Sequence, residues 1–199
     1  MRTKISLLSA LMAVFTFSNI YSQSVLICGS PVEAVWLTDV QMKIQATGQF
    51  GTVDVFNTSV ATPSTATMLG YDAILNFTDV SPVDPTLYGN NLASYIDQGG
   101  GVVNCVFAVA SVPVLGAFGT TTYAVAEFAN AQTQNVPLSL GTVVNPIHPI
   151  LSGVNSFQGG SSSYNSPGTT FAAGSSINAY WSNGQWLVAT RENVGPMSV

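Results

Sequence analysis

The chain has 199 residues, of which only 7% are charged, against about 25% in an ordinary soluble domain. The net charge is −5, and beyond residue 22 the only basic residues are Lys43 and Arg191. So few cations cannot build the basic surface that phosphate backbones require, which excludes a nucleic-acid partner. A surface of Gly, Ser, Thr and Asn in place of charged residues is typical of an extracellular domain.

The start of the chain has the order of a secretory signal peptide. A basic beginning at Arg2 and Lys4 precedes an apolar run that ends at Phe17, and a polar, small-residue segment follows. The apolar run is shorter than the roughly 20 residues that cross a bilayer, so it predicts export and not a membrane anchor. We expect a signal peptide at residues 1–22, a mature domain at 23–199, and secretion or a place on the cell surface. No later stretch predicts a transmembrane span.

The first half of the mature chain alternates strands with helices. Continuous apolar runs predict strands that are buried on both faces, at 24–29, 52–56, 71–77 and 102–107. Helical spacing of apolar residues predicts helices over 32–47 and 86–98, with a short helical turn at 62–69. This alternation predicts an α/β fold with a mostly parallel sheet and helices on both faces.

Both predicted helices carry further signals. Asp84 followed by Pro85 predicts an N-cap with proline in the first turn of the second helix. The glycine triplet after that helix precedes a strand, the reverse of the order in a phosphate-binding loop, so no nucleotide cofactor is expected. The core-facing side of the first helix is expected to consist of Val32, Val35, Trp36, Val40 and Ile44.

Beyond Phe118 the pattern loosens. Short strands are predicted at 142–144, 178–181 and 186–190, and the Gly- and Ser-rich stretch 152–176 is expected to be a surface loop. Asn183-Gly184, between the last two strands, predicts a hairpin. The final residues resemble the start of one more strand, so the domain is expected to be truncated at Val199, with further domains of the same chain beyond it.

Several segments together resemble a known superfamily. A predicted strand at 71–75 is followed at 92–103 by a helix, the triplet Gly99–Gly101 and a second strand. Two motifs come later in the chain, His-Pro-Ile-x-x-Gly-Val at 148–154 and Thr-Arg-Glu-x-x-Gly at 190–195. In order and spacing they resemble the class I glutamine amidotransferase-like superfamily, and within it the ThuA-like (trehalose utilisation) branch. The resemblance implies a flavodoxin-like, doubly wound sheet.

The same resemblance places the catalytic triad of that superfamily on unsuitable residues. Where its fourth strand turns into a Gly-Ile-Cys elbow, this chain has Asn104, Cys105 and Val106, so Val106 takes the position of the nucleophile. Cys105 lies one residue early, on the opposite face of a strand, although a shift of one residue in the alignment would return it to the elbow. Around His148, the only histidine, the acid position is Ile150. Cys105 and His148 remain weak catalytic candidates.

The two cysteines are expected to be free thiols. Cys28 and Cys105 lie on the first and fourth predicted strands, and a flavodoxin-like order places the third strand between them. Two strand spacings separate their Cα atoms by roughly 9–10 Å, beyond the reach of about 7 Å for a disulfide.

A ligand cleft is expected beyond the carboxyl ends of the strands, where Ser30, Asp79 and Ala108 should meet. Asp79 alone would equally serve as a turn residue, and one histidine without neighbouring carboxylates is a poor metal site. Trp181 or Trp186 could stack on a carbohydrate, although packing within the hairpin explains both residues as well.

The leading hypothesis is a non-catalytic binding or scaffold domain of an exported or cell-surface multidomain protein, a pseudoenzyme for which a carbohydrate is one candidate ligand. The alternative is a secreted hydrolase or carbohydrate-utilisation enzyme that uses the cleft at the strand ends. Val106 and Ile150, in the places of the nucleophile and the acid, favour the first.

Overall fold

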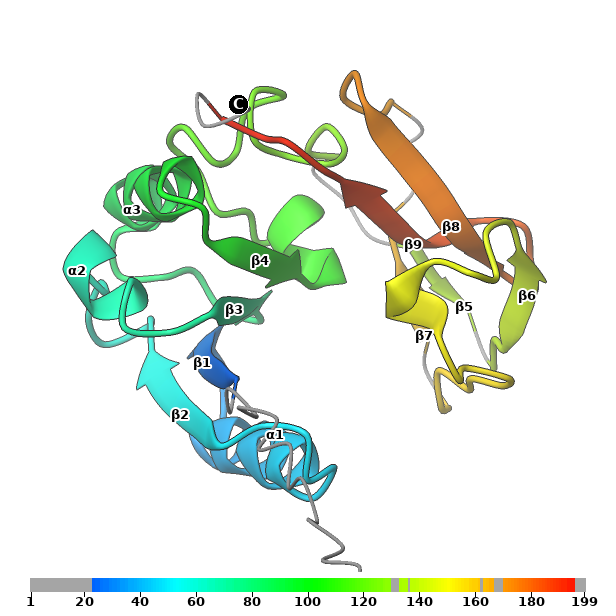
Figure 1. The fold of residues 1–199 in the computed structure, drawn as a ribbon, viewed down its shortest axis with the longest axis horizontal. Coiled ribbons are helices and arrows are strands. Elements are labelled where there is room, and N and C mark those ends of the chain that lie inside the picture. Colours follow the sequence, from blue (N-terminus) through cyan, green and yellow to red (C-terminus); the bar gives the residue numbers. More distant parts are fainter. Residues whose placement is uncertain (1–22, 130–132, 136, 162, 167–169, 196–199) are drawn as a thin grey trace, which may run out of the picture.

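A computed structural model describes residues 23–129, 133–135, 137–161, 163–166 and 170–195. The predicted signal peptide and the strand start at 197–199 lie outside these residues. Figure 1 shows two parts, an α/β part made by the first half of the chain and an antiparallel part made by the second. Within the described residues, no helix has the length and apolar character needed to cross a membrane.

The α/β part is built on a parallel sheet in the order β2-β1-β3-β4. Its strands are β1 (Ser24–Ser30), β2 (Thr52–Asn57), β3 (Ala73–Thr78) and β4 (Gly101–Asn104). Residues Val25–Ser30 of β1 are all buried, as expected for the central strand of a parallel sheet that is covered on both faces. The predicted parallel sheet is confirmed, and so is the position of β3 between β1 and β4.

Helices pack against this sheet from both sides. Leu26 and Cys28 share a core with α2 (Thr65–Met68) and α3 (Pro85–Asp97), whereas Val25 and Ile27 pack against α1 (Val35–Gln45). The side chains of successive strand residues point to opposite faces of the sheet, so the apolar residues of β1 contribute to the cores on both faces. At the start of α3, the Leu87 N–H donates to Asp84 Oδ1 at 2.9 Å, which confirms the predicted N-cap.

The predicted core face of α1 is wrong at its N-terminal end. The Val35 side chain is 64% exposed and Trp36 is 43% exposed, while Leu37 is only 5% exposed. Leu37 shares a helix face with Val40 and Ile44, which pack on the sheet. Trp36 precedes Leu37 by one residue, a rotation of about 100° around the helix axis, so it turns to the surface.

The prediction for the fourth strand is wrong at its C-terminal end. β4 stops at Asn104, and the chain enters the short 3-10 helix η1 (Val106–Val109) with Cys105 at its N-cap. The Cys105 N–H still donates to the Asn76 carbonyl at 2.9 Å, and this bond is the last of the ladder with β3. Beyond it, the Thr78 hydroxyl of β3 donates to the Val112 carbonyl at 2.6 Å, so the returning chain covers the end of β3.

The second half of the chain forms separate antiparallel sheets. One has the order β6-β8-β9, with β6 (Leu140–Val143), β8 (Ser175–Trp181) and β9 (Trp186–Arg191); the other pairs β5 (Thr133–Asn135) with β7 (Ser163–Asn165). The turn between β8 and β9 places Gly184 at φ 83°, which confirms the predicted hairpin.

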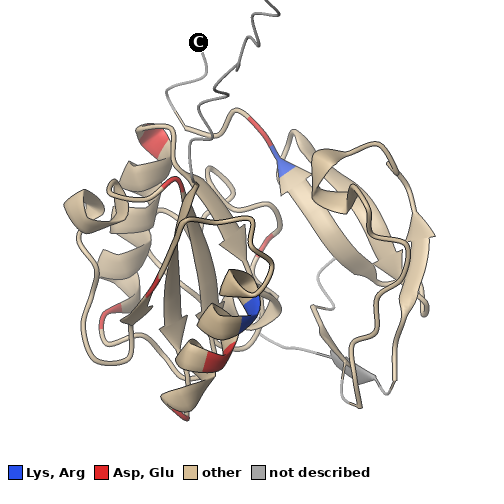
Figure 2. Ribbon diagram, turned by 60° about the horizontal axis from the view of Figure 1, so that its bottom comes forward, with Lys and Arg blue, Asp and Glu red and all other residues tan. Residues whose placement is uncertain are grey.

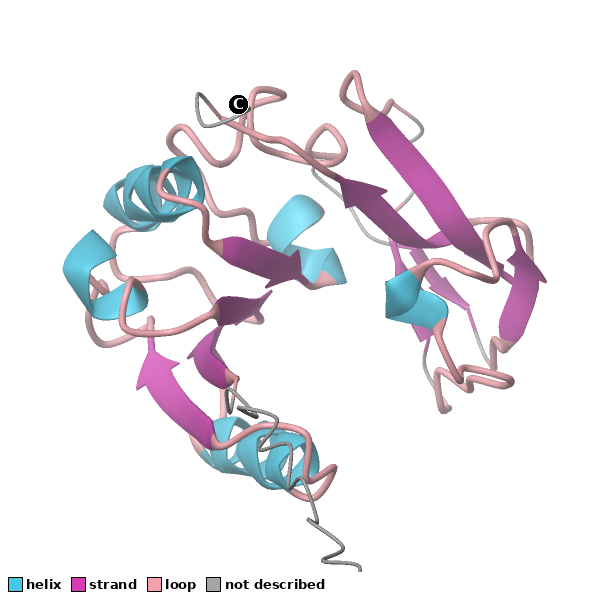
Figure 3. Ribbon diagram, viewed as in Figure 1, coloured by secondary structure: helices cyan, strands magenta, loops and turns pink. Residues whose placement is uncertain are grey.

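The stretch 152–176 is not simply a loop, because it contains β7 and the start of β8 (Figure 3). Its residues are small and polar, so no apolar run marks these strands in the sequence. The molecule is therefore a mixed α/β structure in which a parallel sheet and a separate antiparallel sheet are combined. Charged residues are sparse over both parts (Figure 2).

Candidate functional site

A cavity with a volume of about 560 Å³ lies between the edge strands of the two main sheets. This volume is within the range of about 300–1,000 Å³ that is usual for ligand pockets. Val102–Asn104 of β4 form one wall and Leu187–Arg191 of β9 form the other. Residues 123–126, Ile150 and the end of α3 with the glycines after it also contribute to the lining, which is mainly apolar.

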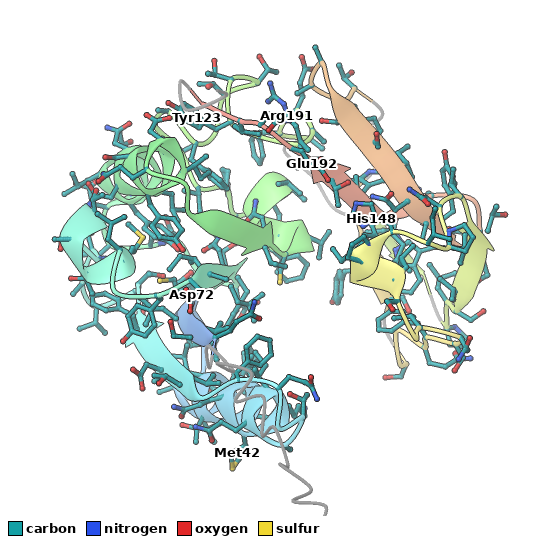
Figure 4. The ribbon with its side chains drawn as sticks, in the orientation of Figure 1. Met42, Asp72, Tyr123, His148, Arg191 and Glu192 are labelled. Atoms are coloured by element: carbon teal, nitrogen blue, oxygen red, sulfur yellow. The ribbon has the colours of Figure 1, made fainter. Side chains whose placement is uncertain are left out.

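Two polar contacts hold the segment that closes the cavity. The hydroxyl of Tyr123 donates to both carboxylate oxygens of Asp97 at 2.9 Å, and this hydrogen bond raises the pKa of Tyr123. Arg191 Nη1 donates to the backbone carbonyls of Thr121, Thr122 and Ala124 at 2.7, 3.1 and 3.0 Å. The guanidinium at the end of β9 therefore binds the backbone of this segment (Figure 4).

A chain of buried side chains leads to Asn104 in the cavity wall. The Tyr88 hydroxyl donates to Asn76 Oδ1 at 2.8 Å, and Asn76 Nδ2 donates to Asn104 Oδ1. Tyr88 and Asn76 are completely buried, and burial raises the pKa of Tyr88 well above its usual value, so the hydroxyl keeps its proton. Asn104 Oδ1 is the acceptor in this bond, and Asn104 Nδ2 has no acceptor among the described residues.

From the sequence, Asn104 was predicted only to align with the first residue of the elbow, and no binding role was predicted for it. A signal was present, because Asn76 and Asn104 interrupt two apolar strand runs and buried polar side chains need partners. What the sequence does not give is the register that puts Asn76 beside Asn104.

Neither cysteine is activated. Both are free thiols, as predicted, with Cys28 fully buried and Cys105 partly buried. Burial raises the pKa of Cys28 to about 12 and that of Cys105 to about 11. A thiolate is the reactive form of cysteine, so at neutral pH very little of either residue is nucleophilic. Cys105 also lies just outside β4, and not inside a buried strand as predicted.

His148 has a carboxylate neighbour that sequence reasoning missed. Its Nδ1 accepts a hydrogen bond from the Ile150 N–H at 3.2 Å, and its Nε2 lies 4.0 Å from Glu192 Oε1. The segments 148–154 and 190–195, which carry part of the family resemblance, therefore meet in space (Figure 4). The sequence held one signal for this contact, because both segments belong to the same family resemblance. Ile150 lines the cavity, whereas His148 and Glu192 do not.

Ser30 and Asp79 lie side by side after β1 and β3, but neither they nor Ala108 line the main cavity. The Asp79 N–H donates to the Ser30 carbonyl at 3.0 Å, and the buried Ser30 hydroxyl donates to the Val80 carbonyl at 2.6 Å. Asp79 Oδ2 accepts from the Val32 N–H at 3.3 Å. These groups close the loop after β1, while Ala108 borders a small pocket beside Asn104. Their role as a ligand cleft stays a prediction.

The tryptophans do not form a common surface. Trp36 lies on the exposed side of α1, and Trp181 is buried against Phe157 with ring centroids 5.5 Å apart. Trp186 packs edge-on against Phe171 and lines the cavity. In the part of the chain that the structure describes, no group of three or more His, Cys, Asp or Glu residues could hold a metal ion.

No protein-family model and no curated protein matches the sequence. Among solved structures, the chain is similar to a protein described as ThuA-like from Bacteroides uniformis, with a TM-score of 0.57 and 15% identity over 87% of this chain and 75% of that one. A protein with the same description from Parabacteroides merdae gives a TM-score of 0.54 and 16% identity, over 85% and 74%. The fold is ThuA-like. At this identity the likeness concerns the fold, and a ThuA-like fold does not by itself assign an activity.

Proposed function

We propose that this chain is a non-catalytic binding domain of an exported or cell-surface protein, and that its binding site is the cavity between β4 and β9. The observation that carries the proposal is the chemistry of the cavity wall. Among the described residues that line it, none carries a thiol, carboxylate or imidazole. An amide-hydrolysing site needs a nucleophile, a base and a group that orients the base within hydrogen-bond reach of one another.

The strand order supports assignment to the amidotransferase-like superfamily. The order β2-β1-β3-β4 reproduces the first four positions of a flavodoxin-like sheet. In such a domain the end of β4 is the place of the elbow, and here Asn104, Cys105 and Val106 occupy it. The raised pKa of Cys105, about 11, is opposite to the lowered pKa of a cysteine nucleophile.

The lining also favours an uncharged ligand. Its described residues include no acid, and the one cation among them, Arg191, already donates to three backbone carbonyls. A charged ligand would lose its hydration without gaining an opposite charge. Asn104 supplies a polar contact within the mainly apolar wall.

Two assays test the absence of catalysis. We expect no glutaminase or amidase activity, and slow labelling of Cys105 by iodoacetamide that accelerates about tenfold per pH unit below its pKa. Cys105→Ser should change no hydrolytic rate. Rapid labelling at pH 6 together with hydrolysis that Cys105→Ser removes would refute the proposal.

Export is a separate part of the proposal and has its own test. The order of charge, apolar run and polar segment in residues 1–22 supports cleavage before Gln23. Mass spectrometry of exported material should find Gln23 at the N-terminus, and an intact Met1 on exported protein would contradict this.

The 4.0 Å approach of His148 to Glu192 favours a secreted hydrolase as the second candidate. A carboxylate beside an imidazole can stabilise the protonated ring during proton transfer. This candidate predicts a hydrolytic activity that His148→Gln abolishes and Glu192→Gln reduces by more than about tenfold. An assay on amide, ester and glycoside substrates with both variants distinguishes it from the first.

A further inference from the structure

We propose that the cavity takes up an extended, uncharged peptide strand from a separate chain, which forms backbone hydrogen bonds with β4 on one side and β9 on the other. The inference deepens the proposed function, since it names the ligand class for the same cavity. It follows from three features, namely the direction of the β4 backbone, the open edge of β9 and the held side chain of Asn104.

The backbone of β4 turns part of its polar groups into the cavity. The Cys105 N–H donates to the Asn76 carbonyl of β3. Successive residues of a strand direct their N–H and C=O groups to opposite sides, so Val103 also faces β3, whereas Val102 and Asn104 face away from it. Val102 and Asn104 both line the cavity. They therefore offer it an alternating series of donors and acceptors.

The opposite wall is a second open edge. Among the described residues, Leu187–Arg191 of β9 pair with β8 on one side and line the cavity on the other. An unpaired strand edge is a template for another strand. A ligand that serves two such edges must alternate donors and acceptors along two sides, and an extended polypeptide does so.

The side chain of Asn104 adds a fixed donor at the end of β4. Asn76 Nδ2 occupies its Oδ1, and the completely buried Tyr88 holds Asn76 in turn. Asn104 Nδ2 is then positioned to donate to a carbonyl or side-chain oxygen of the bound strand. Together with an apolar lining that lacks free charge, this favours a peptide of uncharged, β-branched residues.

Amide hydrogen exchange measured by NMR tests the proposal directly. In the chain alone, the amides of Val102 and Asn104 should exchange rapidly, while that of Val103, which faces β3, should be protected. The probe is a capped hexapeptide that alternates threonine and valine. At ten times its Kd, it should slow exchange at Val102 and Asn104 about tenfold and leave Val103 unchanged. The same peptide with alternate amides N-methylated should have no effect.

Two variants separate backbone pairing from general damage. Val102→Pro removes an N–H that faces the cavity, and proline is tolerated on the open side of an edge strand, so peptide binding should weaken at least about tenfold while Val103 stays protected. Asn104→Asp keeps the acceptor for Asn76, loses the donor and adds a charge, so it should weaken peptide binding even if Val102→Pro fails to fold.

Four outcomes would overturn the inference. If the amides of Val102 and Asn104 exchange slowly without peptide, at every protein concentration, then the same chain covers this edge. Protection that disappears on dilution would mean that a second copy does. Binding of a neutral oligosaccharide, or no slowing by the peptide, would leave a binding domain without strand pairing. Amidase activity at Cys105 would instead refute the proposed function and leave the open edges unexplained.

Discussion

The two halves of this chain build sheets in different ways. In the α/β part, β1 is a continuous apolar run, and each of its faces packs on helices. In the antiparallel part, the side chains of β9 are all only partly buried, and in β8 only Asn178, Ala179 and Trp181 are buried. The first sheet is stabilised mainly by its two cores, whereas the second depends more on backbone pairing and on polar contacts with its neighbour.

The largest expected effect is a core truncation in the α/β part. Ile74 is completely buried in the core beside α3, so Ile74→Ala should lower the free energy of unfolding by about 3 kcal/mol. Leu187→Ala on β9, where the side chain is only partly buried, should cost about 1 kcal/mol. Urea denaturation of both variants measures the difference. Equal losses would show that the two parts depend on burial to the same extent.

The next effect concerns the buried side chains behind Asn104. Asn76→Leu removes the partner of both Tyr88 and Asn104, and should cost about 2 kcal/mol because it leaves buried polar groups unpaired. Tyr88→Phe removes only one hydroxyl, so about 1 kcal/mol is expected. Thermal unfolding compares them, and a larger loss in Tyr88→Phe would contradict the idea that Asn76 is the common partner of Tyr88 and Asn104.

Arg191→Gln tests the polar contacts between the parts. The substitution replaces a charged donor to three carbonyls and should cost about 1.5 kcal/mol. The amides of residues 121–124 should then exchange faster, with those of β1 unchanged. Faster exchange in β1 as well would mean that Arg191 supports the whole fold.

The smallest effect is a pH dependence at the N-terminal end of β1. The Ser24 N–H and hydroxyl donate to Asp72 Oδ2 at 2.7 and 2.8 Å, and these hydrogen bonds lower the pKa of Asp72. A carboxyl with a lowered pKa in the folded state stabilises the fold above its unfolded pKa, and this contribution is lost as the pH falls through the folded pKa. Asp72→Asn should therefore reduce the change in melting temperature between pH 6 and about pH 3. An unchanged pH profile would refute the contribution.

The sequence predicted best the strands of the parallel sheet, which are covered on both faces. The apolar runs of β1 and β3 are long enough to be predicted as strands. Asp84-Pro85 marks the start of α3, because Asp84 caps the helix and Pro85 is in its first turn. The predicted strand through Phe107 failed because Val106 and Phe107 are as apolar as strand residues, yet the chain turns into η1. β5 and β7 were missed because long-range pairing, and not an apolar pattern, forms them.

The candidate site was harder to predict for the same reason. Asn104 gains its role from Asn76, on a neighbouring strand, and His148 gains a carboxylate neighbour from Glu192, in a distant segment. Sequence reasoning placed Cys105 inside a buried strand, whereas it lies just after β4, where burial raises its pKa to about 11. The separation of the two sheets depends on tertiary contacts that no local pattern encodes.

Asp97, at the end of α3, contacts two segments that lie far apart in the sequence. It accepts both hydrogen bonds from Tyr123, and Gly195, at φ 86°, lies so close to it that a Cβ atom would collide with its carboxylate. One helix end thus anchors the segment before the antiparallel part and the segment after it. A side chain at position 195 would collide with Asp97 Oδ1 and would be strained by the positive φ, so substitution of Gly195 should displace the carboxylate to which Tyr123 donates.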